Sequence, residues 1–311
     1  MAETVTIFGA SGFIGRYVVQ ELARRGARIR AVTRDPHTAQ HLKPLTALGQ
    51  LGFAKANLAD AASVKAACEG ADAVINLIGI LDGDEDDFEA VQRDGARRIA
   101  EAAAEAGAEA LVQVSAIGAD SDAEADYART KGEGEEAVKA AFPQATIIRP
   151  SIVFGAEDEF LNRFASLMRF APMMPVVAPK ATFQPVYVVD LAEAIAEAVM
   201  ASATHAGRTY EVGGPDVVTM RELMEFIARV IQRDVVLADV PDVVAGGMAK
   251  AFGWMPGAPM THDQWRMLQK PNVVTGENGL AAFGISPTPM QAVAPNWLVR
   301  YRRQGRFTAA A

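Results

Sequence analysis

Tyr127 and Lys131 are four positions apart, so on a helix their side chains lie on one face, one turn from each other. A tyrosine, with a pKa of about 10, is a poor acid or base near neutral pH. A neighbouring ammonium group and a positively charged nicotinamide ring would stabilise the phenolate. With Ser115 at the end of the preceding predicted strand, these side chains favour proton transfer coupled to hydride transfer. A tyrosine and a lysine on an exposed helix face are the alternative that the spacing leaves open.

Three glycines near the N-terminus predict where a dinucleotide binds. Residues 5–8 form a short apolar strand and apolar residues recur at helical spacing from Phe13 onward, so the glycines lie in the connecting turn. Such a turn lets the backbone approach a pyrophosphate, whose charge the helix N-terminus favours. The spacing is G-x-x-G-x-x-G instead of G-x-G-x-x-G, and an ordinary strand-to-helix turn is the alternative. The predicted binding residues are Gly9, Ser11, Gly12, Phe13, Ile14 and Gly15.

The end of the second predicted strand, at 28–33, indicates which dinucleotide fits. Arg34 and Asp35 follow it, where the adenosine ribose would lie. An acidic residue there would bind the ribose 2′-hydroxyl group of NADH, whereas an arginine would bind the 2′-phosphate of NADPH. Because Arg34 comes first and has the longer reach, we expect NADPH, with NADH as the alternative. An arginine in a solvated loop is the other interpretation.

The ends of two further predicted strands complete the expected cofactor site. The strand at 50–54 is followed by a turn where the adenine edge would rest. The strongly apolar strand at 73–79 ends beside the point where doubly wound sheets hold their ligands. The residues expected at these two ends are Asn57, Leu58, Leu77, Ile78 and Gly79.

Strands and helices alternate through the first half of the chain. The predicted strands are 5–8, 28–33, 50–54, 73–79, 111–115 and 146–150, with helices at 61–69, at 88–106 and from Tyr127 onward. This alternation predicts a doubly wound parallel α/β sheet of the Rossmann type over residues 1–150. Residues 151–311, where prolines punctuate shorter elements, predict a smaller α/β lobe. Whether strands between about 184 and 212 rejoin the main sheet is left open.

Length and charge limit the functions that the chain can have. Its 311 residues are 50% hydrophobic, enough for one large core or two unequal lobes. The net charge of −8 and pI near 5.2 argue against a nucleic-acid partner, because phosphate binding needs a basic face. The sequence shows no targeting peptide and no run of the roughly 18 apolar residues that a membrane span needs. We expect a bacterial-type protein on the cytoplasmic side of the inner membrane, soluble or peripheral.

The sequence does not predict a metal site. Cys68 is the only cysteine, which excludes an internal disulfide and a cysteine-rich metal site and suits a reducing compartment. His37 and His41 are four apart on a predicted helix but lack a third ligand. The acidic run at 82–87 is interpreted as a solvated loop, since a run alone does not supply convergent ligands.

Several of these motifs together resemble a known superfamily. The glycine turn, Ser115, Tyr127-x-x-x-Lys131 and Arg149-Pro150-Ser151 resemble the extended and atypical short-chain dehydrogenase/reductases over essentially the first 155 residues. Residues 7–19, 127–133 and 149–165 look more narrowly like the NADPH-binding accessory subunit of respiratory complex I and its bacterial relatives. The pattern Phe-Gly-x-Glu-Asp-x-Phe-Leu-Asn at 154–162 is the most specific part, because the Rossmann fold does not require it.

The resemblance implies a fold that holds a nucleotide tightly, without established turnover. It implies a role in structure or assembly on the peripheral arm of NADH:ubiquinone oxidoreductase, with other subunits of that arm as partners. It also places Pro150 and Ile152 beside the cofactor. Ser115, Tyr127 and Lys131 would then be catalytic in type but vestigial in use.

A free NAD(P)-dependent oxidoreductase, epimerase or dehydratase of the same superfamily is the competing interpretation. The intact Ser115, Tyr127 and Lys131 favour it. Gln92 stands where many extended enzymes have an asparagine, and acidic residues at 120–126 crowd the approach to the tyrosine. A substrate as anionic as a sugar nucleotide would instead need basic residues there.

The C-terminal third predicts a partner surface. Aromatic and methionine side chains, which are enriched in interface cores, occur at Trp254, Met255, Met260, Trp265 and Met267. Positive charge gathers in a tail at Arg300, Arg302, Arg303 and Arg306, beside Trp297, Tyr301 and Phe307. We expect this Arg300–Arg306 tail to dock on an acidic subunit or on anionic lipid headgroups. A core-filling role for the first group and a solvated tail are the alternatives.

Overall fold

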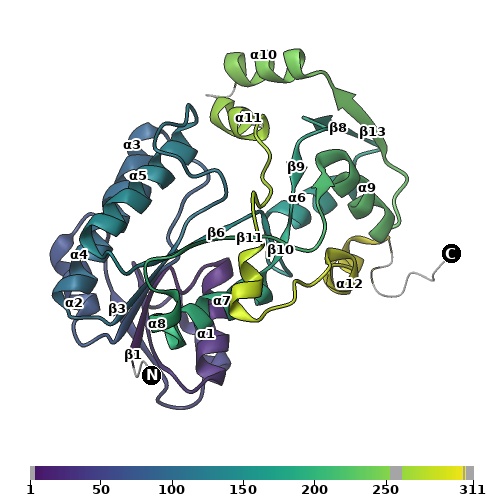
Figure 1. Ribbon diagram of the computed structural model, residues 1–311. Coiled ribbons are helices and arrows are strands. Elements are labelled where there is room, and N and C mark those ends of the chain that lie inside the picture. Colours follow the sequence, from purple (N-terminus) through teal and green to yellow (C-terminus); the bar gives the residue numbers. More distant parts are fainter. Residues whose placement is uncertain (1–3, 253–260, 304, 306–311) are drawn as a thin grey trace. The chain divides into compact units, whose positions relative to one another are not determined.

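The chain divides into two compact units in the computed structural model, which describes residues 4–252, 261–303 and 305 (Figure 1). The first unit contains the described parts of Met1–Pro150, Val188–Val212 and Gly276–Ser286. The second contains those of Ser151–Tyr187, Gly213–Thr275 and Pro287–Ala311. A single cut of the chain at residue 150 would therefore not separate the two units, because Val188–Val212 and Gly276–Ser286 also belong to the first unit.

The first unit is built on a parallel sheet of seven strands. Their order is β11-β6-β5-β4-β1-β2-β3, and every neighbouring pair is parallel. The strands are β1 Thr4–Phe8, β2 Arg28–Thr33, β3 Leu51–Lys55, β4 Ala73–Asn76, β5 Ala110–Val114, β6 Thr146–Pro150 and β11 Thr209–Val212. The predicted Rossmann-type sheet is confirmed. Strand β11 joins it at the edge of β6, where it satisfies backbone groups that would otherwise be open.

The central strands are buried on both faces, and their order determines the edge of the sheet at which a ligand would bind. All residues of β4 and β5 are buried, as expected for apolar strands covered by helices on both sides. Strand β1 pairs with β2 on one side and with β4 on the other, so the order of the strands reverses there. Ligands bind outside the carboxyl ends of the strands at such a switch point, here beyond Phe8 and Asn76.

Helices cover both faces of this sheet (Figure 1). Helices α1 (Phe13–Arg24) and α7 (Val188–Met200) lie on one face, joined by an ion pair of 2.6 Å between Arg25 and Glu197. Helices α2 (Ala61–Cys68), α4 (Ala96–Glu105) and α5 (Asp126–Ala141) lie on the other. Their apolar faces share one core that includes Val64, Ile99 and Val138.

The helix predicted at 88–106 is interrupted. It consists of α3 (Glu85–Phe88), a π-helical segment η2 (Glu89–Gly95) and α4. The backbone of η2 meets α5 closely: a Cβ added to Gly134 would lie 2.2 Å from the Gln92 carbonyl oxygen. Leu58 likewise lies 2.7 Å from a Cβ added to Gly95. Hydrophobic periodicity does not reveal such a bulge, which here coincides with a tight backbone contact.

The second unit has short paired strands around a separate core. Its pairs are β7 (Val153–Phe154) with β10 (Val186–Tyr187), β9 (Thr182–Phe183) with β12 (Val218–Thr219), and β8 (Met173–Val177) with β13 (Val236–Val240). Its longer helices are α6 (Phe160–Met168), α9 (Met220–Val230) and α10 (Asp242–Phe252). Phe154, Leu161, Met168 and Ile227 lie at the centre of the core. The second unit therefore has its own apolar interior.

Several minor elements complete the description. They are η1 Gln40–Leu45, α8 Ser202–His205, α11 His262–Leu268, η3 Gly279–Phe283, α12 Met290–Val293, α13 Pro295–Leu298 and η4 Val299–Tyr301. His37 precedes η1, so the two histidines do not share a helix as the sequence suggested. Burial raises the pKa of Cys68 to about 12, which makes this thiol inert. Within the described residues, no helix combines the length and apolar character needed to cross a bilayer.

A buried ion pair fixes α5 to the sheet. Arg149, in β6, donates two hydrogen bonds of 2.8 and 2.7 Å to the carboxylate of Glu135 in α5. Glu135 is 3% exposed, and hydrogen bonding to it raises the pKa of Arg149. A carboxylate this deeply buried needs its partner, because an uncompensated charge in the interior is strongly unfavourable.

We expect Arg149→Met to lower the free energy of unfolding by about 3 kcal/mol, since it leaves the Glu135 carboxylate without its main partner. Urea unfolding followed by circular dichroism measures the change. Arg97→Met is the matched control, because Arg97 pairs with Glu101 at 3.0 Å on the exposed surface. Its loss should cost about 0.5 kcal/mol or less. Equal effects of the two substitutions would contradict the role given to the buried pair.

Candidate nucleotide-binding site

The glycine turn joins β1 to α1 and exposes the start of that helix. Gly9 has a φ of +81°, which favours glycine, and the N–H of Gly12 donates to its carbonyl oxygen at 3.1 Å. Helix α1 begins at Phe13 without a side-chain cap. Its first N–H groups therefore remain available to an anion, and the positive end of the helix dipole reinforces this preference.

The three glycines serve different purposes. A Cβ added to Gly15 would lie 2.3 Å from the Gly9 carbonyl oxygen, so the fold itself excludes a side chain there. One added to Gly12 would meet the same oxygen at 3.3 Å, a tight contact that a small shift relieves. Gly12 is exposed and its φ of −75° suits any residue. The fold itself therefore does not require a glycine at position 12, and the absence of a side chain there leaves room for a ligand to approach the backbone closely.

The predicted cofactor residues of the first unit follow the carboxyl ends of successive parallel strands. Because these ends meet at one edge, the residues share that edge although they are far apart in sequence. Gly9 contacts the end of β4 directly, since a Cβ added to it would lie 3.3 Å from both Leu77 and Ile78. In strand order the residues are Gly9 and Ser11 after β1, Arg34 after β2, Asn57 and Leu58 after β3, Leu77, Ile78 and Gly79 after β4, and Ser115 after β5. Pro150 ends β6.

Asp35 and Arg34, the two residues that could bind the ribose, differ in the contacts that they already make within the protein. The Asp35 carboxylate accepts the N–H of His37 at 3.0 Å and so stabilises its own turn. Arg34 is exposed and makes no hydrogen bond or ion pair with any residue that the structure describes. A guanidinium without a protein partner is the better candidate for a ligand phosphate, which favours a 2′-phosphate over a free 2′-hydroxyl group.

Tyr127 and Lys131 lie on the first two turns of α5. The Lys131 Nζ atom is 6.0 Å from the centroid of the Tyr127 ring, and Phe88 packs edge-on against that ring. Lys131 is 6% exposed. A Cβ added to Gly79 would lie 2.9 Å from the Lys131 Nζ atom, so the amine reaches the segment that follows β4. The structure thus brings this lysine to the switch point of the sheet.

Burial shifts both titrating groups toward their neutral forms. It raises the pKa of Tyr127 to about 12 and lowers that of Lys131 to about 8. The sequence suggested the opposite direction for Tyr127, with the ammonium group stabilising a phenolate. In the protein alone, desolvation of the buried Tyr127 side chain dominates its pKa. At neutral pH, Tyr127 therefore keeps its proton.

A buried hydroxyl group at the same edge has no partner. Ser115 is 5% exposed, and its Oγ atom makes no hydrogen bond within the described residues. The Oε1 atom of buried Gln92 also lacks a hydrogen-bond partner among the described residues, although its Nε2 atom donates to Thr130 at 3.4 Å. Orphaned buried polar atoms are rare and favour a ligand that completes them. Together with the open space at Gly12, Ser115 shows that the residues present fit a bound dinucleotide.

Two glycines missed by the sequence interpretation position this helix. A Cβ added to Gly132 would lie 2.3 Å from the backbone nitrogen of Ser121, and one on Gly134 would meet η2. Glycine inside a helix is less favourable than alanine by about 1 kcal/mol, so two within one helix signal a required close approach. That signal was present at 132 and 134 and could have been used.

The tract at 154–164 has a structural explanation in the second unit. Asp158 is 3% exposed, and its carboxylate accepts N–H groups of Gly155 and Leu161 at 3.0 and 2.6 Å. Asn162 donates to the carbonyl oxygens of Ala156 and Asp158. The acidic and amide positions of the motif therefore hold the loop that leads into α6. Ile152, predicted beside the cofactor, also belongs to this unit, where its N–H donates to Asn272.

Two arginines of the predicted basic tail are used inside the second unit. Arg300 donates to Asn162 at 2.8 Å and to the Ala156 carbonyl oxygen at 3.1 Å. Arg302 donates to the Val230 carbonyl oxygen at 2.9 Å. Trp297 stacks on Tyr187 with 6.4 Å between ring centroids. Trp254, Met255, Met260, Arg306 and Phe307, also predicted at a partner surface, lie outside the described residues.

Comparison with known proteins identifies the family. A family model described as NAD(P)H-binding matches residues 9–159. Over 303 residues the chain is 36% identical to NADH dehydrogenase (ubiquinone) 1 alpha subcomplex subunit 9 of Mus musculus, covering 96% of this chain and 80% of the relative. It is 34% identical over 311 residues to the NADH-ubiquinone oxidoreductase 40 kDa subunit of Neurospora crassa, covering 98% and 81%. The chain belongs to this family of NADH dehydrogenase subunits. The resemblance inferred from the motifs is confirmed.

Two further similarities describe the wider group. The chain is 33% identical over 265 residues to ceramide reductase of Caulobacter vibrioides, covering 82% of this chain and 80% of the relative. The NADPH-dependent quinone oxidoreductase QOR2 of Escherichia coli, in complex with NADPH, shares the fold with a TM-score of 0.75 and 21% identity. That likeness covers 94% of this chain and 99% of QOR2. Both nucleotide-dependent enzymes and respiratory subunits therefore share this architecture.

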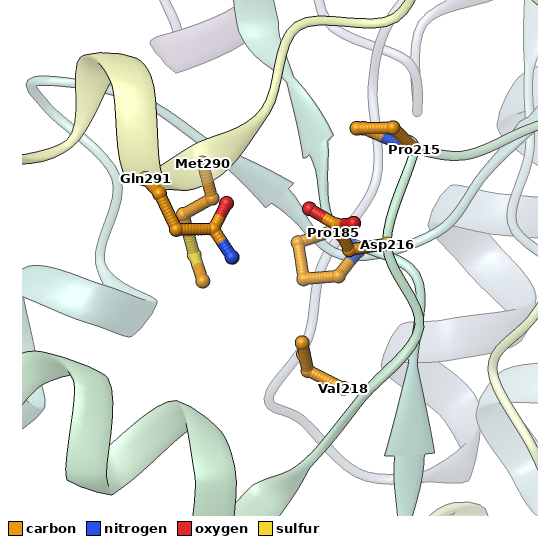
Figure 2. A pocket seen from close by; sticks show the side chains of 6 residues that line it. All are labelled: Pro185, Pro215, Asp216, Val218, Met290 and Gln291. Atoms are coloured by element: carbon orange, nitrogen blue, oxygen red, sulfur yellow. The ribbon is translucent and has the colours of Figure 1, made fainter.

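A small hollow belongs to the second unit. Its volume is about 10 Å³, and it is lined by Pro185, Pro215, Asp216, Val218, Met290 and Gln291. Figure 2 shows Met290 and Gln291, from α12, extending toward Pro185 and Asp216. None of the residues predicted to bind the nucleotide lines it. The space is small, so we assign no ligand to it.

We expect Gly12→Val to weaken NADPH binding about a hundredfold, equivalent to about 3 kcal/mol, because the side chain enters the space beside the first N–H groups of α1. Isothermal titration calorimetry measures the affinity. The unfolding free energy of the nucleotide-free protein should stay within about 1 kcal/mol, since valine tolerates the extended backbone of residue 12. Gly15→Ala should instead lower the unfolding free energy of the nucleotide-free protein, because its Cβ would collide with the Gly9 carbonyl oxygen. Unchanged affinity in Gly12→Val would contradict the site.

Lys131 predicts a pH dependence of stability. Its folded pKa of about 8 lies below the ordinary value of 10.5, so between these values the unfolded chain binds more protons than the folded one. The stability of the nucleotide-free protein should therefore rise as pH increases from about 8 to 10, by as much as about 3 kcal/mol. Lys131→Met should remove the rise in urea unfolding, whereas Lys65→Met, which changes a lysine paired with Glu105, should not. A parent protein without the rise would contradict the burial of a charged amine.

Proposed function

We propose that this chain is an NADPH-binding accessory subunit of a respiratory NADH:quinone oxidoreductase, in which the nucleotide supports stability and assembly instead of turnover. The similarity to the mouse subunit carries the proposal, because it covers 96% of this chain and so includes both units. The tract at 154–164 supports it through a specific clamp: Asp158 and Asn162 order the loop, and Arg300 binds it from the C-terminal region.

NADPH is the proposed ligand, and each contact has a candidate in the first unit. The N–H groups around Gly12 would bind the pyrophosphate, and Arg34 would bind the 2′-phosphate. The Ser115 hydroxyl group and the Lys131 amine would donate hydrogen bonds at the nicotinamide end. When bound, the nucleotide would supply a hydride for any reduction. Among the described residues, the Ser115 Oγ atom has no hydrogen-bond partner, and the Lys131 amine reaches the segment that follows β4 at the switch point of the sheet.

The electrostatics of the site support a structural ligand. With a pKa of about 12, Tyr127 is a weak acid that holds its proton at neutral pH. Lys131 is buried, and desolvation of its amine outweighs the favourable charge of Glu135, so its charge is poorly solvated in the empty protein. An anionic nucleotide would offset this unfavourable burial. Binding would then stabilise the fold in proportion to RT ln(1 + [L]/Kd).

The proposal includes a place in the cell. We propose that the chain lies peripherally on the cytoplasmic side of a membrane, as part of the peripheral arm of the complex. Arg300 and Arg302 have roles inside the second unit, which leaves Arg303, exposed, as the available cation of the described tail. The tail alone is thus a weaker candidate for a lipid or subunit contact than its sequence suggests.

A carbonyl reductase is the second candidate function. The ceramide reductase relative favours it, and so does the presence of Ser115, Tyr127 and Lys131 at one edge of the sheet. Tyr127 would then donate its phenolic proton to the oxygen of the reduced carbonyl group, with Ser115 donating a hydrogen bond to that oxygen. The acidic residues at 120–126 favour an uncharged substrate over an anionic one.

We expect the native protein to co-migrate with NADH:quinone oxidoreductase activity on native gels after mild detergent solubilisation of membranes. Nucleotide extracted from it should be NADPH by mass spectrometry. A Tyr127→Phe strain should keep normal complex activity and content, because the phenolic proton is not used in a structural role. A Gly12→Val strain should lose complex content through instability of the empty subunit.

Other outcomes separate the two candidates. Protein found free of the complex, with normal complex content in a deletion strain, would contradict the accessory-subunit proposal. A Tyr127→Phe strain with an intact complex and an accumulated carbonyl compound would favour the reductase. Extraction of NADH alone would contradict the role given to Arg34.

A further inference from the structure

The second unit exposes apolar side chains at the start of its β8–β13 pair. Met173 and Val236 are in register in this parallel pair, and they are 58% and 60% exposed. The N–H of Val236 also donates to the Pro172 carbonyl oxygen. Phe170, three residues before Met173, is 79% exposed. In-register residues of neighbouring strands point to the same face, so Met173 and Val236 form one apolar projection, and exposed Phe170 lies close to it in sequence.

Each of the two chain segments carries an arginine that is close to this projection in sequence, and Arg233 is half-buried. The Arg169 guanidinium lies 5.3 Å from the centroid of the Phe170 ring, and Arg233 is three residues before Val236. Neither forms an ion pair with an acidic side chain in the described part of the chain. We call Phe170, Met173, Val236, Arg169 and Arg233 the β8–β13 tip. Figure 1 shows the two strands side by side in the second unit.

Further positive charge lies beside the tip. Arg229 is exposed on the last turn of α9, and Arg302 binds the Val230 carbonyl oxygen at the end of that helix. Arg303 follows and is exposed. Asp234 is the acidic residue of this stretch. The local balance is therefore strongly positive in a chain whose net charge is −8.

We propose that the β8–β13 tip binds an anionic lipid surface. Large exposed apolar side chains with arginines close to them in sequence match an interface where apolar groups enter the acyl boundary and cations meet phosphates. A soluble protein has little reason to keep three such side chains exposed in one place. Arginine is also well suited to phosphate, since its planar group donates several hydrogen bonds at once. The proposal gives the second unit a contact centred on the β8–β13 pair, to which Arg302 and Arg303 of the Arg300–Arg306 tail would add charge.

This inference deepens the peripheral location in the proposed function but is tested without other respiratory subunits. Purified protein is mixed with vesicles of phosphatidylcholine alone or of phosphatidylcholine with phosphatidylglycerol, and bound protein is separated by flotation. We expect binding to the anionic vesicles, weak binding to the neutral ones, and a loss of binding as salt increases. No flotation with either vesicle would overturn the proposal, even if the protein still co-migrates with the complex.

Variants assign the binding to the tip. Phe170→Ser with Val236→Ser, and separately Arg169→Gln with Arg233→Gln, should each reduce partition onto anionic vesicles at least tenfold, since one arginine near such a surface accounts for about fivefold. Leu48→Ser with Arg208→Gln is the matched control, because both residues are exposed in the first unit. Circular dichroism and NADPH binding verify that each variant is folded. Equal flotation of parent and tip variants would overturn the assignment.

The alternative occupant is an acidic protein surface. In that case, parent protein would not float with anionic vesicles, but it would bind the purified complex lacking this subunit in detergent. The tip variants would weaken that binding. This result would overturn the lipid proposal in favour of a protein partner.

Discussion

Helix α5 can occupy its position only because two of its residues lack side chains. A Cβ on Gly134 would lie 2.2 Å from the Gln92 carbonyl oxygen, and one on Gly132 would lie 2.3 Å from the Ser121 nitrogen. These backbone contacts, with the buried Arg149–Glu135 pair, hold the helix between η2 and the sheet. Lys131 therefore reaches the switch point as a consequence of packing that occurs elsewhere on the same helix.

The same packing creates a group of polar atoms that the protein does not satisfy. Lys131 is buried, and the Ser115 hydroxyl group has no partner within the described residues. Each would be unfavourable in a protein that remained empty. A dinucleotide would complete both and would meet the free N–H groups at the start of α1. These unsatisfied groups, like the glycine spacing, favour a bound nucleotide.

The sequence predicts the sheet well because its signals are local. Apolar runs such as 73–76 and the glycine turn give strand, helix and their connection directly, and parallel pairing then places the strand ends at one edge. The π-helical segment, the return of β11 to the first sheet and the shifted pKa of Tyr127 depend on contacts between distant residues. Periodicity carries no information about those. The internal role of Arg300 in the basic tail is hidden for the same reason, since only the fold shows that it donates to Asn162.

The second unit distinguishes a subunit from a minimal nucleotide-binding protein. Its motif at 154–164 is fully used in holding one loop: Asp158 accepts the N–H groups, Asn162 ties the loop carbonyls, and Arg300 joins the loop to the C-terminal region. These hydrogen bonds within the second unit account for Asp158 and Asn162 without a catalytic role. Among the surfaces that the unit exposes is the β8–β13 tip, where apolar side chains occur with arginines that form no ion pair among the described residues. The proposed nucleotide site and the proposed lipid contact belong to different units of one chain, so each can be tested without disturbing the other.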